Sequence, residues 1–420
     1  MSRLLYSLLW HLGLPLIGLR LLWRARRQPE YLQHLGERFG LSTLPHSARP
    51  RIWLHTVSVG ETRAAQPIIK TLLVEFPDHD ILLTHMTPTG RATGEELFGQ
   101  ETRITLCYLP YDLPWAQRRF LARTRPQLGI VMETEVWPNL MAAAETAGVP
   151  MLLANARLSA RSARGYTRLG TLSRNAFARF AQVLAQTEDD AARLQACGAR
   201  EVRICGNVKF DVELAPTLIA RGAEFRASAA ERPVILAAST REGEEEPLLT
   251  AFTRHAPAGA LLVLVPRHPQ RFDEVAALVD KQGLALQRRS EGLHIDTETR
   301  VWLGDSMGEM VAYFRMADVA IIGGSWQPLG GQNLIEACAA GAPVLVGPHT
   351  FNFNEAASKA IAAGAALRCG DLDEALMTAT GLLRDAKARA RMSQAGEDFA
   401  RTNRGATMRT LETIRQLLPR

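Results

Sequence analysis

The segment at residues 55–63, His-Thr-Val-Ser-Val-Gly-Glu-Thr-Arg, combines a carboxylate, a glycine and hydroxyl groups in one short stretch. The apolar run Ile52-Trp53-Leu54 precedes it and apolar residues at helical spacing follow, so Ser58-Val59-Gly60 is predicted to be a turn between a strand and a helix. Gly60 would allow close backbone approach or a positive φ there. Glu61 then has two interpretations: an acid favoured by the dipole at a helix start, or a general base at the mouth of a cleft.

Other chemically useful side chains also follow expected strands. Glu133 and Glu135 come after the apolar run at 128–132, and they would point the same way if that strand continued. Pro138 is predicted to open the next helix, and capping of that helix is as good an interpretation of Glu135 as a functional role. Lys209 is one of only five lysines in a chain with 44 arginines. The use of lysine here suggests that this position requires a compact positive charge.

The second half of the chain carries candidates for binding an anion. Pro266 and Pro269 enclose Arg267 and His268, and a guanidinium can grip a phosphate with two hydrogen bonds. His268 fits a packing or capping role equally well. The segment Gly304–Glu309 leads into a helix whose free N–H groups could hold an anion.

A second Gly-rich segment, Gly330–Glu336, also enters a helix, and Glu336 one turn inside it would suit a ribose diol. Neither half contains Gly-x-Gly-x-x-Gly or a Walker loop, which disfavours dinucleotide and P-loop sites. None of these candidate segments contains an Asp-x-Asp pair, so helix ends and cations would have to take the place of a metal ion.

These residues are positioned by alternating strand-like and helix-like segments, which predict an α/β fold with mainly parallel, doubly wound sheets. The pattern loosens at 211–232 and then starts again, so two Rossmann-like lobes are expected to face a cleft. The expected division is a membrane anchor at 1–27, a first lobe at 28–210, a linker at 211–232, a second lobe at 233–405, and a C-terminal helix at 406–420 that crosses back to the first lobe.

The N-terminal sequence indicates an association with a membrane. Residues 4–19 carry no charge, Pro15 would kink a helix there, and arginines follow at 20–27. A charge-free run of this length is short for a spanning helix, and no small-residue cleavage site follows it. A spanning or interfacial anchor with a cytoplasmic body is therefore predicted, although a buried helix of the first domain would show a similar pattern.

Composition narrows the class of protein. With 47% hydrophobic and 22% charged residues, the chain is typical of a folded globular protein. Its five cysteines lie far apart, which argues against a disulfide scaffold or a zinc ribbon and fits a reducing compartment. Residues 1–51 contain eight arginines and two glutamates and so carry the whole formal net charge of +6, which argues against a nucleic-acid surface on the main body.

Several motifs together resemble the Kdo (3-deoxy-D-manno-octulosonic acid) transferases of lipopolysaccharide synthesis, over nearly the whole chain and in the same order. The motifs that carry the resemblance are His55-Thr-Val-Ser-Val-Gly-Glu61, Met86-Thr-Pro-Thr-Gly90, Tyr108-Leu-Pro-Tyr-Asp112, Met132-Glu-Thr-Glu135, Trp137-Pro-Asn139, Ala154-Asn-Ala-Arg-Leu-Ser159, Val265-Pro-Arg-His-Pro269 and Gly347-Pro-His-Thr-Phe-Asn-Phe353. Thr56 and the segment at 332–335 depart slightly from the family pattern.

The resemblance implies a GT-B glycosyltransferase that moves Kdo from CMP-Kdo to the lipid A precursor, with inversion and with no cofactor or bound metal. Its acceptor would bind the N-terminal lobe and its donor the C-terminal lobe, at the cytoplasmic side of the inner membrane among its lipids. By motif, Glu61 would accept the proton, and Glu133 and Lys209 would stabilise the transition state. CMP would be held by Pro266, Arg267, Met307, Gly308, Glu309, Asn333, Leu334, Ile335 and Glu336.

Two alternatives remain open at this point. One is a GT-B enzyme with another donor, or a nucleotide-sugar epimerase of the same fold. The other is a non-catalytic, membrane-associated binding protein that keeps the two-lobed shell. Preference for CMP over UDP would distinguish the first alternative, and loss of transfer on replacing Glu61 would distinguish the second.

Overall fold

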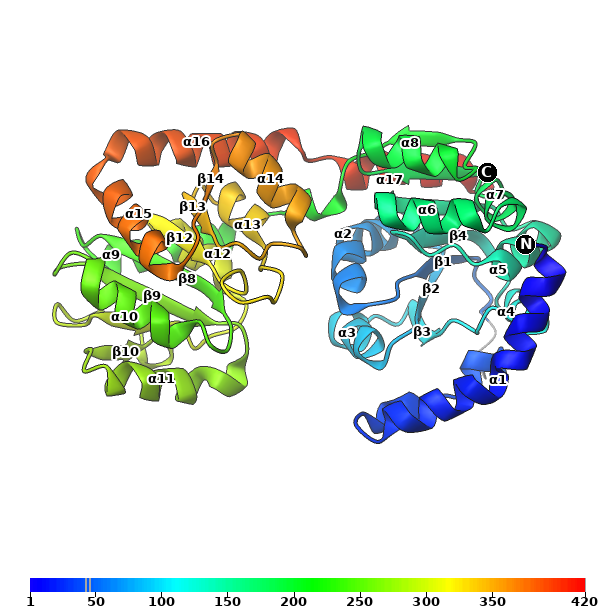
Figure 1. Cartoon of the computed structure of the whole chain (residues 1–420), viewed down its shortest axis with the longest axis horizontal. Coiled ribbons are helices and arrows are strands. Elements are labelled where there is room, and N and C mark those ends of the chain that lie inside the picture. The colour runs from blue at the N-terminus through cyan, green and yellow to red at the C-terminus, as the bar shows by residue number, and fades with distance from the viewer. Residues whose placement is uncertain (42–43, 45–46, 420) are drawn as a thin grey trace. The chain divides into compact units, whose positions relative to one another are not determined.

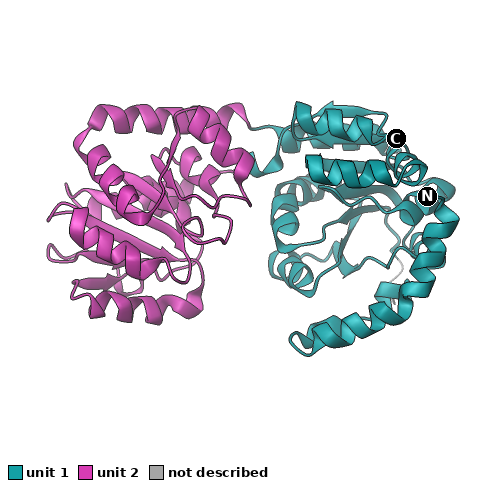
Figure 2. Cartoon of the chain, viewed as in Figure 1, with its two compact units in different colours: residues 1–211, 404–420 teal, residues 212–403 magenta. Residues whose placement is uncertain are grey.

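A computed structural model describes the chain except for residues 42–43, 45–46 and 420. The described chain divides into two compact units (Figure 2). Unit 1 comprises Met1–Asp211 together with Arg404–Arg420, and unit 2 comprises Val212–Asn403.

Unit 1 is built on one parallel sheet of seven strands in the order β3-β2-β1-β4-β5-β6-β7 (Figure 1). The strands are β1 (Arg51–His55), β2 (Asp80–His85), β3 (Ile104–Tyr108), β4 (Pro126–Met132), β5 (Met151–Ala156), β6 (Gln182–Ala185) and β7 (Val202–Ile204). Both faces of the sheet are apolar: Trp53 and Val131 belong to one buried cluster, and Ile52 and Leu54 to another. Such continuous apolar strands are typical of a parallel sheet with helices on both sides.

The helices of unit 1 include those that connect successive strands, one that precedes β1 and one that follows unit 2 in the chain. They are α1 (Arg3–Ala25), α2 (Val59–Glu75), α3 (Pro88–Phe98), α4 (Pro114–Thr124), α5 (Pro138–Ala147), α6 (Ala160–Arg168), α7 (Thr171–Phe177), α8 (Glu188–Ala196) and α17 (Ala406–Leu417). Helix α17, the red helix within unit 1 in Figure 1, packs against α2 and β5. Its Leu411 and Ile414 are fully buried in the same cluster as Ile52, so the last residues of the chain complete the first core.

Unit 2 repeats the plan with a second parallel sheet, in the order β10-β11-β9-β8-β12-β13-β14. Its strands are β8 (Val234–Thr240), β9 (Leu261–Pro266), β10 (Leu286–Arg288), β11 (Val301–Leu303), β12 (Val319–Ile322), β13 (Val344–Val346) and β14 (Ala366–Arg368). Its helices are α9 (Pro216–Ser228), α10 (Glu245–His255), α11 (Phe272–Lys281), α12 (Met310–Met316), α13 (Leu334–Ala339), α14 (Asn354–Ala362), α15 (Leu372–Arg384) and α16 (Ala386–Thr402).

The expected linker at 211–232 contains α9, which packs against α12 as part of unit 2. Pro216 occupies the first turn of this helix, where a missing N–H costs nothing. Phe225 is fully buried and makes ring contacts with Trp302 and Tyr313, at centroid distances of 5.0 and 5.2 Å. The loosened pattern therefore marks a helix with a narrow apolar face, not an unstructured connection.

Helix α1 is long and apolar enough to cross a membrane by length and composition. It is continuous through Pro15, and only Leu21 is buried among its residues. Leucines at 4, 5, 8, 9, 12, 16, 19 and 22 are exposed, whereas Ser7 and Trp10 contact the body of unit 1. The helix therefore has one face on the protein and an apolar face left outside.

Candidate functional site

The strand order of unit 1 reverses between β1 and β4, and open α/β sheets bind ligands outside the carboxyl ends of the strands at such a switch point. Glu61 follows β1, and Glu133 follows β4 directly. Because β1 and β4 are paired neighbours, their carboxyl ends bring these two acids to the same edge of the sheet.

Glu61 lies in the first turn of α2, as the sequence predicts, and its carboxylate is tied to that helix start. The Val57 N–H donates to Glu61 Oε2 at 2.7 Å, and the Ser58 hydroxyl donates to Oε1 at 3.1 Å. Ser58 is the N-cap of α2, so the expected turn at 58–60 is wrong in detail. Gly60 lies inside the helix, and it does not have a positive φ.

The surroundings of Glu61 nevertheless differ from those of an ordinary capping acid. Burial raises the pKa of Glu61 to about 7, the hydrogen bond from Val57 opposes this rise, and the negative charge of Glu133 adds to it. Glu135 acts in the same direction more weakly. Helix capping and a poised base are thus both compatible with the geometry, because a carboxylate has lone pairs beyond those used by two donors.

Glu133 has a left-handed backbone, with φ of 57°. Strand β4 ends at Met132, so the strand does not continue and the condition under which Glu133 and Glu135 would point the same way is not met. The Glu133 carboxylate is mostly covered, and its Oε2 lies 3.3 Å from Nε of the half-exposed Arg157. A non-glycine residue in this conformation is held there by its surroundings, and such positions concentrate at functional sites.

Glu135 does not cap α5. Its Oε2 accepts a hydrogen bond from Trp137 Nε1 at 2.9 Å, and burial raises its pKa. The start of α5 is capped by Asp112 instead, whose two carboxylate oxygens accept from Asn139 N at 3.0 Å and from Leu140 N at 2.8 Å. Local sequence around 135–140 gives no sign of this cap, since Asp112 comes from the segment after β3.

Lys209 lies in the 3-10 helix Val208–Phe210, which packs against α2, the helix of Glu61. Its backbone N–H donates to Asn207 Oδ1 at 3.0 Å. Val208 N donates to Oδ1 of Asn155, a residue with a left-handed φ of 51° at the end of β5. The backbone that carries Lys209 is therefore held to the neighbouring strand.

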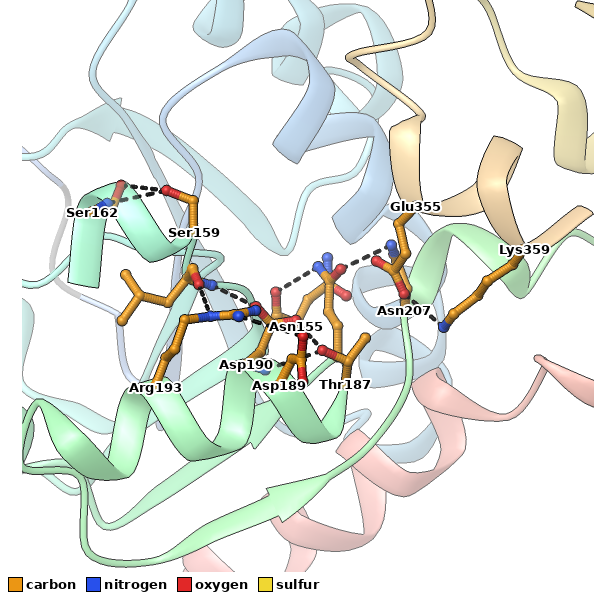
Figure 3. A network of polar contacts seen from close by, with 12 residues as sticks. Asn155, Ser159, Ser162, Thr187, Asp189, Asp190, Arg193, Asn207, Glu355 and Lys359 are labelled. Carbon is orange, nitrogen blue, oxygen red and sulfur yellow. Dashed lines mark hydrogen bonds and ion pairs between the residues drawn. The ribbon is translucent and has the colours of Figure 1, made fainter. Parts of the chain in front are cut away.

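Figure 3 shows the polar network that fixes this edge of unit 1. Asn207 donates to Gln186 Oε1 at 3.0 Å, and Gln186 donates in turn to the backbone oxygen of Asn155 at 2.9 Å. In the first turn of α8, Asp190 accepts from Leu158 N at 2.8 Å. Side-chain amides and a carboxylate therefore join the loops that follow β5, β6 and β7.

In unit 2 the strand order reverses between β8 and β12, and β9 is the other neighbour of β8. Arg267 follows Pro266 at the end of β9, and its N–H donates to Thr240 O at 3.0 Å. The pKa of His268 is lowered by burial and then by the positive charges of Arg241, Arg267 and Arg271. Cations thus gather at the carboxyl edge of this sheet, as an anionic ligand requires.

Residues 307–309 lie between β11 and α12. Met307 is exposed, and Gly308 has a φ of 79° that favours glycine. The Glu309 carboxylate is engaged, because Oε1 lies 3.2 Å from Arg221 Nη1 and 3.0 Å from Arg289 Nη2. Backbone groups here are accessible to a ligand, while Glu309 holds the loop to its neighbours.

The segment 333–336 opens α13. Asn333 is its N-cap, with Oδ1 accepting from Ile335 N at 3.1 Å. Leu334 and Ile335 are buried at 1% and 0% exposure, so only their backbone groups can face a ligand. Burial raises the pKa of Glu336.

Glu244 is a further site residue that sequence reasoning missed. Its buried carboxylate accepts from Arg241 N at 2.9 Å, Gly324 N at 2.8 Å and Trp326 N at 3.0 Å. These N–H groups belong to the loops after β8 and β12, so one side chain joins the two sides of the switch point. The run of three glutamates at 244–246 is typical of a solvated helix start, which conceals that Glu244 and Glu245 are both buried.

Among the residues that the structure describes, no group of three or more His, Cys, Asp or Glu side chains is arranged to hold a metal ion. The candidate site residues of unit 1 are carboxylates, with Lys209 on a segment that packs against the helix of Glu61. Those of unit 2 are arginines and the backbone N–H groups of loops. The first set suits proton transfer from a hydroxyl, and the second suits a phosphate.

Comparison with known proteins identifies the family. The family model described as 3-deoxy-D-manno-octulosonic-acid transferase (kdotransferase) matches residues 33–212, and that of glycosyl transferases group 1 matches 279–399. The chain is 48% identical over 435 residues to the 3-deoxy-D-manno-octulosonic acid transferase of Bordetella pertussis, and 36% identical over 428 residues to that of Haemophilus influenzae, in both cases over 100% of each chain.

The fold agrees with this relationship. A glycosyltransferase structure from Rickettsia africae superposes with a TM-score of 0.58 over 89% of this chain and 99% of that chain, at 12% identity. The two Rossmann-like units are the architecture of a GT-B glycosyltransferase, as expected. The chain is a glycosyltransferase and belongs to the family of 3-deoxy-D-manno-octulosonic acid transferases.

Proposed function

We propose that the enzyme transfers Kdo from CMP-Kdo to the lipid A precursor with inversion at the anomeric carbon. The observation that carries the proposal is the gathering of Glu61, Glu133 and Glu135 at the switch point of unit 1, with the pKa of Glu61 raised to about 7 by burial. A base with such a pKa is half ionised near neutral pH, where it can still accept a proton efficiently.

On the acceptor side, Glu61 takes the proton of the attacking sugar hydroxyl. The oxygen of that hydroxyl forms the new bond to the anomeric carbon of Kdo while the bond from this carbon to the CMP phosphate oxygen breaks. The bonds that Glu61 accepts from Val57 and Ser58 fix its carboxylate, so little reorientation is needed when the proton moves.

Charge develops on both partners during the transfer. The sugar becomes oxocarbenium-like, and the carboxylate of Glu133, oriented by Arg157, is suited to stabilise that positive charge. Lys209 supplies a positive charge for the anionic groups of the donor. These roles follow from the family motif, and the covered position of Glu133 supports its part, because a charge acts more strongly where water is excluded.

On the donor side, CMP is held by Pro266 and Arg267, by 307–309 and by 333–336. Arg267 pairs with the phosphate, and the loop at Gly308 brings backbone groups close to it. Since Leu334 and Ile335 are buried, they contribute through their backbone. In this arrangement arginines and N–H groups stabilise the departing phosphate without a metal ion.

We propose that α1 holds the enzyme at the cytoplasmic side of the inner membrane, where its acceptor lies. Its exposed leucines and the arginines at 20–27 suit acyl chains and anionic headgroups respectively. Because Ser7 and Trp10 contact unit 1, α1 lies along the protein body. This supports an interfacial position over one that spans the bilayer.

The test is incubation of the purified protein with CMP-Kdo and a tetraacylated lipid A precursor, followed by product masses. Addition of Kdo is expected, and Glu61→Gln is expected to abolish it while CMP binding persists. CMP is expected to bind where UDP does not. Near-full turnover by Glu61→Gln would refute the base assignment, and binding of UDP in place of CMP would refute the donor.

A further inference from the structure

Helix α1 makes specific polar and aromatic contacts with the segment that carries two of the three site carboxylates. The Ser7 hydroxyl donates to Asn139 Oδ1 at 2.9 Å, across 132 residues of sequence. The Trp10 ring lies 6.4 Å from the Trp137 ring, at an interplanar angle of 32°. Acyl-chain binding has no need of such contacts, so they call for another explanation.

Both contacts reach residues that hold the segment at 133–139 in place. Asn139 is 3% exposed, and its side-chain amide donates to Asp112 O at 2.7 Å while its N–H donates to the Asp112 carboxylate. Trp137 donates to Glu135 Oε2 at 2.9 Å. Asn139 thus fixes one end of the segment, and Trp137 fixes the side chain of Glu135.

The same side of α1 also meets the residues that follow β3. Trp10 lies 6.0 Å from the ring of Tyr111, and Tyr6 interacts with the carboxylate of Asp112. The motifs at 108–112 and 137–139 therefore converge on one junction beneath α1. No residue of these two motifs has a role in the proposed chemistry. Their contacts at this junction give them a structural role instead.

We infer that α1 is a positioning element of the acceptor-side site: Ser7 and Trp10 hold the segment 133–139, and with it Glu133 and Glu135, in the arrangement that transfer requires. The inference rests on the proposed function, because it assumes that these carboxylates act in transfer. The two faces of α1 then have different functions: one face holds the segment 133–139, and the leucines that point away from unit 1 take no part in that junction.

This separation allows a test with matched variants of the full chain. Ser7→Ala and Trp10→Leu loosen the junction and leave the exposed leucines intact. Ser7→Thr keeps the hydroxyl, and Leu12→Ser alters only the exposed face. Activity is measured with the acceptor in detergent micelles, where docking on a bilayer is unnecessary, alongside CMP affinity and binding to anionic phospholipid vesicles.

Ser7→Ala combined with Trp10→Leu is expected to lower kcat at least tenfold at saturating substrates, because a misplacement of about 1 Å is enough for such a loss. CMP affinity and vesicle binding should stay within twofold of wild type, and Ser7→Thr should keep wild-type kcat. Leu12→Ser should weaken vesicle binding and leave kcat in micelles unchanged.

Hydrogen exchange gives a readout that does not depend on activity. The amides of Asn139 and Leu140 should exchange faster in the Ser7/Trp10 variant, while those of α2 keep their protection. A kcat within twofold of wild type, or a parallel loss of CMP affinity, would overturn the inference. Absence of Kdo transfer by the wild-type enzyme would instead overturn the proposed function, and the exchange measurement would still decide whether α1 holds the segment.

Discussion

Replacement of Glu61 by glutamine is expected to stabilise the protein at alkaline pH while it removes activity. The folded-state pKa of Glu61, about 7, lies above its usual value of 4.5 because the carboxylate is buried near Glu133. Between these values the folded state binds more protons than the unfolded state, so the wild type loses stability as pH rises through this window. Glutamine resembles the neutral acid and avoids that loss.

The size of the effect follows from the raised pKa. A rise from 4.5 to about 7 corresponds to roughly 3 kcal/mol of unfolding free energy, at about 1.4 kcal/mol per unit. The carboxylate accepts from Val57 N and from the Ser58 hydroxyl. An amide has only one oxygen, so part of one hydrogen bond is lost, at about 1 kcal/mol. The net gain should be about 2 kcal/mol at about pH 8.5, and close to zero or slightly negative near pH 5.

Urea unfolding of the wild type and the variant across this pH range measures the difference. Tryptophan fluorescence reports mainly on unit 1, which contains five of the seven tryptophans. Glu188→Gln is the matched control, since Glu188 also lies in the first turn of a helix but is exposed. It should lose a few tenths of a kcal/mol at every pH through the helix dipole.

A Glu61→Gln variant that is no more stable than wild type at about pH 8.5 would refute the reasoning, because it would mean that the carboxylate is well solvated. The wild-type rate offers an independent check. Since the base acts in its ionised form, kcat/KM should rise with pH through about 7. An acidic limb near the usual pKa of glutamate would contradict a buried base even if the stability result agreed.

Three further changes test the framework of the two sites. Asp112→Ala should destabilise unit 1 by about 1–2 kcal/mol in urea unfolding, because the cap of α5 is lost. Glu244→Gln should weaken CMP binding in calorimetry, because one amide oxygen cannot accept from three loop N–H groups. Gly323→Ala should lower both CMP affinity and the melting temperature, since its Cβ would lie 2.4 Å from Ser239 O. Wild-type behaviour in any of these would show that the contact concerned is dispensable.

Much of the fold could be predicted from the sequence because central parallel strands are apolar on both faces. The run at 261–265 shows this, and it matches β9. Strands β10 and β14, the edges of the second sheet, lack such a run and have the sequences Leu-Gln-Arg and Ala-Leu-Arg. An edge strand buries less surface, so its sequence carries little hydrophobic signal.

The candidate site was predictable in its position along the chain but not in its contacts. Glu61 at a helix start follows from the local pattern, whereas its raised pKa depends first on burial in the folded unit and then on the charge of Glu133, which is distant in sequence. The left-handed φ of Glu133 has no local signature, because this residue type rarely adopts it. Glu244 was hidden because its residue type carries no sign of burial: Glu244 and Glu245 are buried, whereas Glu246 beside them is exposed.

The return of α17 to unit 1 affects how the protein is made. Leu411 and Ile414 fill the core beside Ile52, yet they leave the ribosome only after all of unit 2 has been synthesised. Throughout that interval the first unit lacks part of its interior and exposes apolar surface on α2 and β5. Nascent chains at this stage should therefore bind chaperones, and unit 2, whose sequence is continuous, is free to finish folding first.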